Sequence, residues 1–167
     1  VHLTQSQWPA AETAFEGALS KEPRHGKAAA NLGKLLLDRG QVRSAAQVIA
    51  VALAEEGGLP QVVDLVRLCV IRLAADPDPS RRDGALALAL GDQFLAQRGA
   101  GDGLPEALRA AAMAELGDFP GAIAAAERAV LQAQAASNRS AVQAVSNQLA
   151  GYRRGQPFRM SPQSRSN

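Results

Sequence analysis

A pattern of apolar residues that recurs at a fixed interval is the feature that most limits what this chain can fold into. Five positions return after 34 residues: Trp8, Ala11, Phe15, Ala18 and Leu19 recur as Val42, Ala45, Ile49, Ala52 and Leu53. An interval of about this length is typical of stacked helical hairpins, each of which packs on its neighbours. Such arrays present extended surfaces that hold other molecules.

The composition agrees with helices and disfavours a sheet. Hydrophobic residues make up 47% of the chain but aromatic residues only 4%, so most of the apolar content is small, chiefly alanine. Alanine is the strongest helix former. The long runs of valine, isoleucine, threonine and aromatic residues that predict strands are missing. We therefore expect an all-α fold.

Small residues set the register of the predicted hairpins. A small residue followed by two alanines, at spacings of five and seven, occurs three times: Ser6, Ala11, Ala18; Gly40, Ala45, Ala52; and Gly117, Ala122, Ala129. Alanines seven residues apart share one helical face, where their small side chains let a second helix approach closely. The side chain of Asp118, just before the third pair of alanines, suits an N-cap.

Residues 26–59 resemble one complete tetratricopeptide repeat. The matching residues are Ala29, Leu32, Gly33 and Leu36 on a first helix, Gly40 at the turn, and Ala45, Ile49 and Ala52 on a second helix. The resemblance extends over residues 3–58 and 104–133 and is weaker over 60–98. It implies a right-handed α-solenoid of helical hairpins, from a fragment or the C-terminal domain of a bacterial protein of this family.

The predicted organisation is a solenoid over residues 1–159, followed by a disordered tail over 160–167. Its parts are a partial repeat (1–22), a full repeat (26–59), a degenerate repeat with an insertion (60–98), a further repeat (104–134) and a capping helix (137–153). In the capping helix we expect Val142, Val145, Leu149 and Tyr152 to face inward. A cap of this kind covers the apolar face that a terminal repeat leaves bare.

The concave groove of such a solenoid is the predicted binding site, because first-helix side chains that point away from the second helix line it. The residues expected there are Lys27, Ala30, Asn31, Lys34, Asp38, Gln61, Asp64, Leu65, Leu68, Leu104, Ala107, Leu108 and Ala111. Their chemistry changes from polar and basic to apolar along the chain. A partner segment with an acidic end and an apolar end would suit this gradient.

Residues that carry chemistry are scarce, and we expect no enzymatic activity, cofactor, metal ion or small-molecule substrate. His2 and His25 are the only histidines, and neither has a companion at metal-ligand spacing. The single cysteine, Cys69, lies in an apolar stripe and suits a buried position. The net charge is +2, and no stacking aromatics accompany the arginines, so we expect no nucleic-acid binding. No run of about 18 apolar residues predicts a transmembrane segment.

The function that the resemblance implies is protein–protein interaction, as a scaffold or adaptor that holds a protein or peptide segment in the groove. Two alternatives remain open. The chain could be the C-terminal accessory domain of a larger membrane-bound or secreted enzyme such as a glycosyltransferase, since it starts in the middle of a repeat. It could also assemble with another subunit through an N-terminal face formed by Trp8, Phe15 and Leu19.

Overall fold

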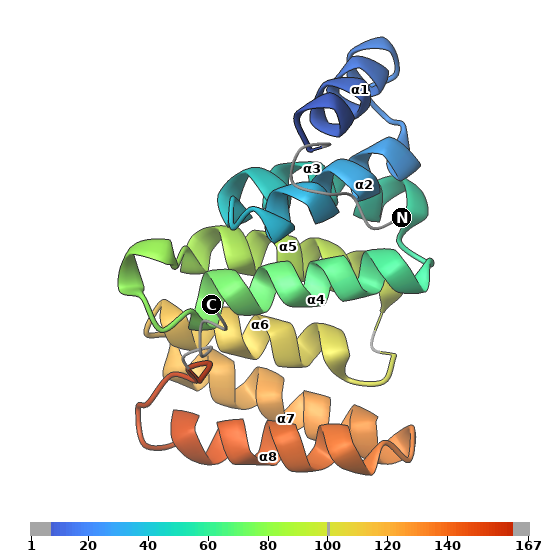
Figure 1. Ribbon diagram of the computed structural model, residues 1–167. Helices are drawn as coiled ribbons and strands as arrows, with labels where there is room; N and C mark the ends of the chain where they lie inside the picture. Colours follow the sequence, from blue (N-terminus) through green and yellow to red (C-terminus); the bar gives the residue numbers. More distant parts are fainter. Residues whose placement is uncertain (1–7, 100, 162–167) are drawn as a thin grey trace. The chain divides into compact units, whose positions relative to one another are not determined.

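The computed structural model describes residues 8–99 and 101–161, and its regular structure over these residues is helical, without a strand. The elements are α1 (Trp8–Lys21), α2 (Gly26–Asp38), α3 (Val42–Glu56), α4 (Pro60–Ala75), the 3₁₀ helix η2 (Pro79–Arg81), α5 (Gly84–Arg98), α6 (Leu104–Glu115), α7 (Phe119–Ala135) and α8 (Arg139–Tyr152) (Figure 1). The all-α prediction is confirmed for these residues. Within each unit, neighbouring helices pack on each other, which is consistent with a helical-repeat solenoid.

The chain divides into two compact units, Val1–Cys69 and Val70–Asn167, and the division falls inside α4. The helix pairs α2–α3, α4–α5 and α6–α7 lie within the predicted repeats 26–59, 60–98 and 104–134, and α8 lies within the predicted capping segment. The division into repeats and the handedness of the solenoid stay predictions.

Small residues bring α2 and α3 into close contact in the first unit. Both alanines of the register, Ala45 and Ala52, have an exposed fraction of 0%. On α2, a Cβ atom added to Gly33 would lie 2.6 Å from Cγ1 of Ile49, so only a hydrogen atom fits there. The two helices lie side by side in Figure 1. Ile49 is fully buried and fills the space that the small residues leave.

The turn that ends α2 is a Schellman motif, and the same motif recurs in the second unit. Gly40 has a φ of +75°, and its N–H and that of the next residue donate back to carbonyl groups of the last turn of α2. The equivalent hydrogen bonds end α6 at Gly117 (φ +81°) and α7 at Ser137 (φ +56°). Glycine adopts this left-handed conformation without strain, whereas serine does not. Asp118 accepts from the N–H of Gly121 at 3.0 Å, which confirms the predicted N-cap of α7.

The helices α6, α7 and α8 lie side by side in the second unit and share a core (Figure 1). Its buried members are Ala110, Ala114, Ala122, Ala125, Ala126, Ala129, Val145, Leu149 and Tyr152. Three of the four residues of α8 that were expected to face inward, Val145, Leu149 and Tyr152, are therefore buried, and Val142 is half-buried.

A buried carboxylate joins α5, α6 and α7. Glu106 on α6 is 5% exposed and binds Arg128 of α7 through two hydrogen bonds of 2.8 and 3.1 Å. Arg109 on α6 donates to Glu106 at 3.0 Å and to Asp92 of α5 at 2.5 Å. Burial alone would raise the pKa of Glu106, but the hydrogen bonds and charges of the two arginines outweigh it and hold the pKa below its usual value.

The segment after α8 folds back onto other parts of the second unit. Arg159 donates to the carbonyl of Ala74 at 3.2 Å and pairs with Glu115 at 2.6 Å. The N–H of Met160 donates to the carbonyl of Ala75 at 2.8 Å. Met160 is the first residue of the predicted tail over residues 160–167, and the disorder of that tail stays a prediction. Residues 162–167 lie outside the described part of the chain.

The left-handed turns predict opposite effects for two substitutions. Gly117→Ala should lower the free energy of unfolding by about 1 kcal/mol, because no atom crowds this position and only the positive φ opposes a side chain. Ser137→Gly should raise that free energy by roughly 0.5 kcal/mol, since glycine relieves the same strain. Urea unfolding followed by circular dichroism measures both. A Gly117→Ala variant as stable as the wild type would contradict the assignment of strain to this turn.

The substitution Glu106→Gln should lower the free energy of unfolding by roughly 2 kcal/mol at neutral pH, because it removes the charge-assisted hydrogen bonds from Arg128 and leaves Arg109 paired with Asp92 alone. The folded pKa is lowered, so the stabilisation is complete above the ordinary value of 4.5 and is lost as the pH falls through the folded pKa. The difference between wild type and variant should therefore shrink below pH 4.5 in urea titrations.

Glu127→Gln is the matched control for this substitution. Glu127 pairs with Arg153 at 2.8 Å, but both side chains are about half exposed. Exposed ion pairs contribute little, so the control should change the free energy of unfolding by less than about 1 kcal/mol. If the two variants lose the same free energy of unfolding, the buried network stabilises the fold no more than an ordinary surface ion pair does.

Candidate functional site

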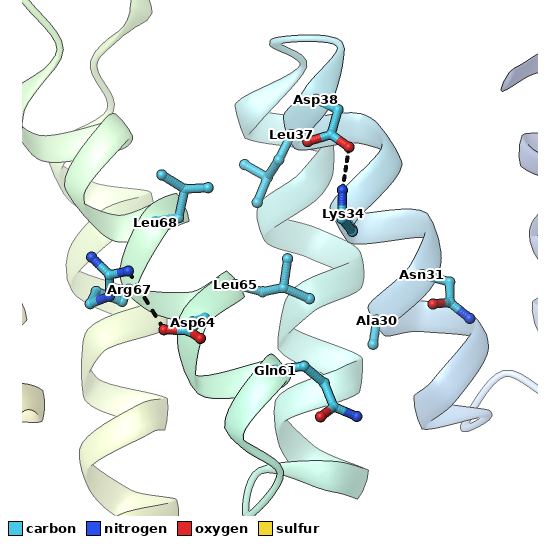
Figure 2. A pocket seen from close by; sticks show the side chains of 10 residues that line it. All are labelled: Ala30, Asn31, Lys34, Leu37, Asp38, Gln61, Asp64, Leu65, Arg67 and Leu68. Atoms are coloured by element: carbon cyan, nitrogen blue, oxygen red, sulfur yellow. Dashed lines mark hydrogen bonds and ion pairs between the residues drawn. The ribbon is translucent and has the colours of Figure 1, made fainter. Parts of the chain in front are cut away.

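The candidate site is a groove between α2 and the first part of α4, and it lies entirely within the first unit. It has a volume of about 450 Å³, and Figure 2 shows the side chains that line it. These are Ala30, Asn31, Lys34, Leu37 and Asp38 from α2, and Gln61, Asp64, Leu65, Arg67 and Leu68 from α4.

Helical periodicity places the α2 residues on one wall. Ala30, Lys34 and Leu37 are four and three residues apart, so they share a face of the helix. The contact between Gly33 and Ile49 holds another face of α2 against α3. The close packing of the hairpin therefore leaves the wall of the groove directed away from α3.

The floor of the groove is apolar. Leu37 is 1% exposed and fixed in the core, whereas Leu65 and Leu68 are half-buried. In Figure 2, Leu68 and Leu37 approach from the two helices, and Leu65 points into the space between them. When a partner covers half-buried leucines on a concave surface, the burial of their apolar area stabilises the complex.

The charges on the two walls are compensated within each wall. Lys34 pairs with Asp38 at 2.5 Å on α2, and Arg67 pairs with Asp64 at 3.5 Å on α4 (Figure 2). All four of these residues are exposed. The sequence suggested that the groove has a basic end at Lys34. Asp38, one helical turn away, neutralises the charge of that lysine.

The structure places most of the predicted groove residues of the first unit in this one site. Asn31, Lys34, Asp38, Gln61, Asp64 and Leu68 all line it, and so do Ala30 and Leu65. Lys27 is exposed on α2 and is not among the residues that line the groove. That these residues contact a partner stays a prediction.

The predicted groove residues of the last hairpin belong to the second unit. Leu104 is half-buried. Leu108 has an exposed fraction of 2%, so its side chain packs inside that unit and is not available to a partner. We therefore leave both residues out of the proposed site.

Sequence reasoning missed Leu37 and Arg67. Leu37 follows Lys34 by three residues and Arg67 follows Asp64 by three, so the helical period that selected the other residues includes both. Leu37 is both a buried core residue and part of the groove floor. Arg67 becomes visible as a site residue once its pairing with Asp64 is considered.

The predicted N-terminal assembly face lies on α1. Trp8, Phe15 and Leu19 are all half-buried. None of the residues of α1 is fully buried. The ion pair between Glu12 and Arg39 joins this helix to the residue that follows α2. Assembly through this face stays a prediction.

The remaining candidates for chemistry have structural roles. His25 accepts a hydrogen bond from the N–H of Ala28 and caps α2. Cys69 is buried, and its thiol contacts the carbonyl of Val42 at 3.7 Å. No three His, Cys, Asp or Glu residues cluster as metal ligands in the part of the chain that the structure describes. Among the helices described, none has the length and apolar character that crossing a membrane requires.

Comparison with known proteins finds a family similarity for part of the chain. The family model described as tetratricopeptide repeat matches residues 2–69. These residues are similar to that family. The matched range includes the whole groove and the α2–α3 hairpin, in agreement with the all-helical structure. No curated protein and no solved structure matches the chain. Tetratricopeptide repeats generally mediate protein–protein interaction and are typically non-catalytic. The repeat predicted over residues 104–134 lies outside the matched range and stays a prediction.

Proposed function

We propose that this chain is a non-catalytic adaptor that holds a segment of a partner protein in the groove between α2 and α4. The observation that supports the proposal most directly is the apolar floor of that groove, which includes the half-buried Leu65 and Leu68. The family supports it as well, because tetratricopeptide repeats generally bind proteins.

The groove favours a partner segment with apolar side chains and no strong net charge. Each wall already carries an internal ion pair, Lys34–Asp38 on α2 and Asp64–Arg67 on α4. A strongly acidic or basic segment would meet one repulsive charge for each attractive one. Burial of a leucine-sized side chain on the floor would contribute about 1.5–3 kcal/mol. The affinity should therefore come mainly from apolar contact and depend weakly on salt.

A second candidate function is assembly through α1. Trp8, Phe15 and Leu19 are large side chains on a helix without a fully buried residue, which is the observation that favours it. Under this alternative, Phe15→Glu should shift the sedimentation coefficient from that of an oligomer to that of a monomer. If the wild type sediments as a monomer over the whole concentration range, assembly of identical copies through α1 is excluded.

The adaptor function predicts that Leu65→Asp weakens partner binding by at least about tenfold, because it places an unpaired charge on the apolar floor. Peptides can be selected from a displayed random library with the wild-type protein and then measured by fluorescence anisotropy. The selected peptides should carry apolar anchors, and their affinities should change little between low and high salt.

Leu131→Asp is the matched control, since Leu131 is 65% exposed and does not line the groove. It makes the same chemical change and should leave peptide affinity unchanged. Circular dichroism of both variants checks that the fold is retained. If Leu65→Asp and Leu131→Asp bind the selected peptides as tightly as the wild type, the groove is not the binding site.

A further inference from the structure

The last two carbonyl groups of α4 bind a segment from a distant part of the chain. The carbonyl of Ala74 accepts from the guanidinium of Arg159 at 3.2 Å, and the carbonyl of Ala75 accepts from the N–H of Met160 at 2.8 Å. The last carbonyls of a helix have no partner within the helix, and they carry a partial negative charge. The end of α4 therefore favours a cationic donor.

A carboxylate at the end of α6 adds a full negative charge to this place. Glu115, the last residue of α6, pairs with Arg159 at 2.6 Å and with Arg82 at 2.9 Å. The side chain of Glu115 is only 15% exposed. If Arg159 moved away, Glu115 would still be paired with Arg82 and would not become an unpaired buried charge. The acceptors should thus stay in place without the segment that binds them.

The segment after α8 lies on the surface of a core that is formed without it. The buried members of that core all come from α6, α7 and α8, and Phe158 packs against them while it is itself half-buried. Residues 156–161 form neither a helix nor a strand. They follow Gly155, which has a φ of +68°. A segment held by so few contacts can leave and return without unfolding of the second unit.

We propose that the second unit has a docking site for a phenylalanine followed by an arginine, and that the chain fills it with its own Phe158 and Arg159 as an exchangeable ligand. The arginine contacts two acceptors at once, the carbonyl of Ala74 and the carboxylate of Glu115. The fork of a guanidinium suits two acceptors, whereas the ammonium of lysine is a point charge. The phenylalanine adds apolar contact with the core. The proposal does not rest on the adaptor groove, which lies in the first unit.

The short connection to α8 sets a bound on the affinity of the site. A segment on a short flexible linker has an effective concentration of about 1 mM at its site. To be docked for about nine-tenths of the time, it needs a dissociation constant of about 0.1 mM or less. A free peptide then finds only about a tenth of the wild-type molecules open, so its apparent affinity for the wild type falls about tenfold.

The test measures binding of a fluorescein-labelled peptide with the sequence of residues 155–161 to the whole chain by fluorescence anisotropy. The double variant Phe158→Ala with Arg159→Ala has an empty site and should bind the peptide with a dissociation constant of about 0.1 mM or less. The wild type should bind it about tenfold more weakly, because its own segment competes. Circular dichroism checks the fold. If the double variant does not fold, the single variant Arg159→Ala takes its place and should also bind the peptide more tightly than the wild type.

Glu115→Gln, added to the variant with the empty site, should weaken peptide binding at least about tenfold, because it removes the charge that the arginine of the peptide contacts. The matched control is Glu127→Gln in the same variant. Glu127 pairs with Arg153 and contacts neither residue of the docked pair, so this control should leave the affinity unchanged. A peptide with lysine in place of its arginine should bind more weakly than the original peptide.

Three results would overturn the proposal. The first is no binding of the peptide at about 1 mM by a folded variant with the empty site. The second is equal affinity of the wild type and that variant, and the third is equal loss of affinity from Glu115→Gln and Glu127→Gln. A scrambled peptide of the same composition that binds equally well would also contradict it, since charge alone would then explain the binding. None of these results tests the groove of the first unit, so the two proposals can fail separately.

Discussion

The close approach of paired helices at positions without bulky side chains is the interaction on which the rest of this structure depends. In the first unit, Gly33 leaves room for Ile49, and Ala45 and Ala52 are completely buried beside it. Interiors are packed as densely as organic crystals, so a single methyl group at such a contact has to displace its neighbours. The small residues therefore fix where α2 lies on α3, and with it which residues of α2 face the groove.

The function that we propose depends on the apolar surface that this packing leaves uncovered. Once α2 is held against α3 and the first part of α4 lies nearby, Leu65 and Leu68 stay half-buried between walls whose charges are already paired. The second unit uses the same kinds of contact but adds long-range polar ones, at Glu106 and at Arg159. Those contacts join α6 to α7 and hold the segment after α8 against Ala74.

The sequence was sufficient for features that recur at a fixed interval and insufficient for features that depend on distant residues. The helices and the N-cap at Asp118 could be predicted because they depend on neighbouring residues. The paired charges of the groove were missed, although Lys34 and Asp38 are only one turn apart, because each was considered singly. The buried Glu106 and the attachment of Arg159 to Ala74 could not be predicted, because the partners lie 22 and 85 residues away in the chain.

The most direct test of the central claim is the free energy of unfolding of Gly33→Ala, alone and combined with Ile49→Ala. Alanine is a better helix former than glycine by about 1 kcal/mol, so an uncrowded position would gain stability. We expect a loss instead, because the new Cβ would lie 2.6 Å from Cγ1 of Ile49. In the double variant the loss should be smaller than the sum of the single losses. A Gly33→Ala protein more stable than the wild type would contradict the account.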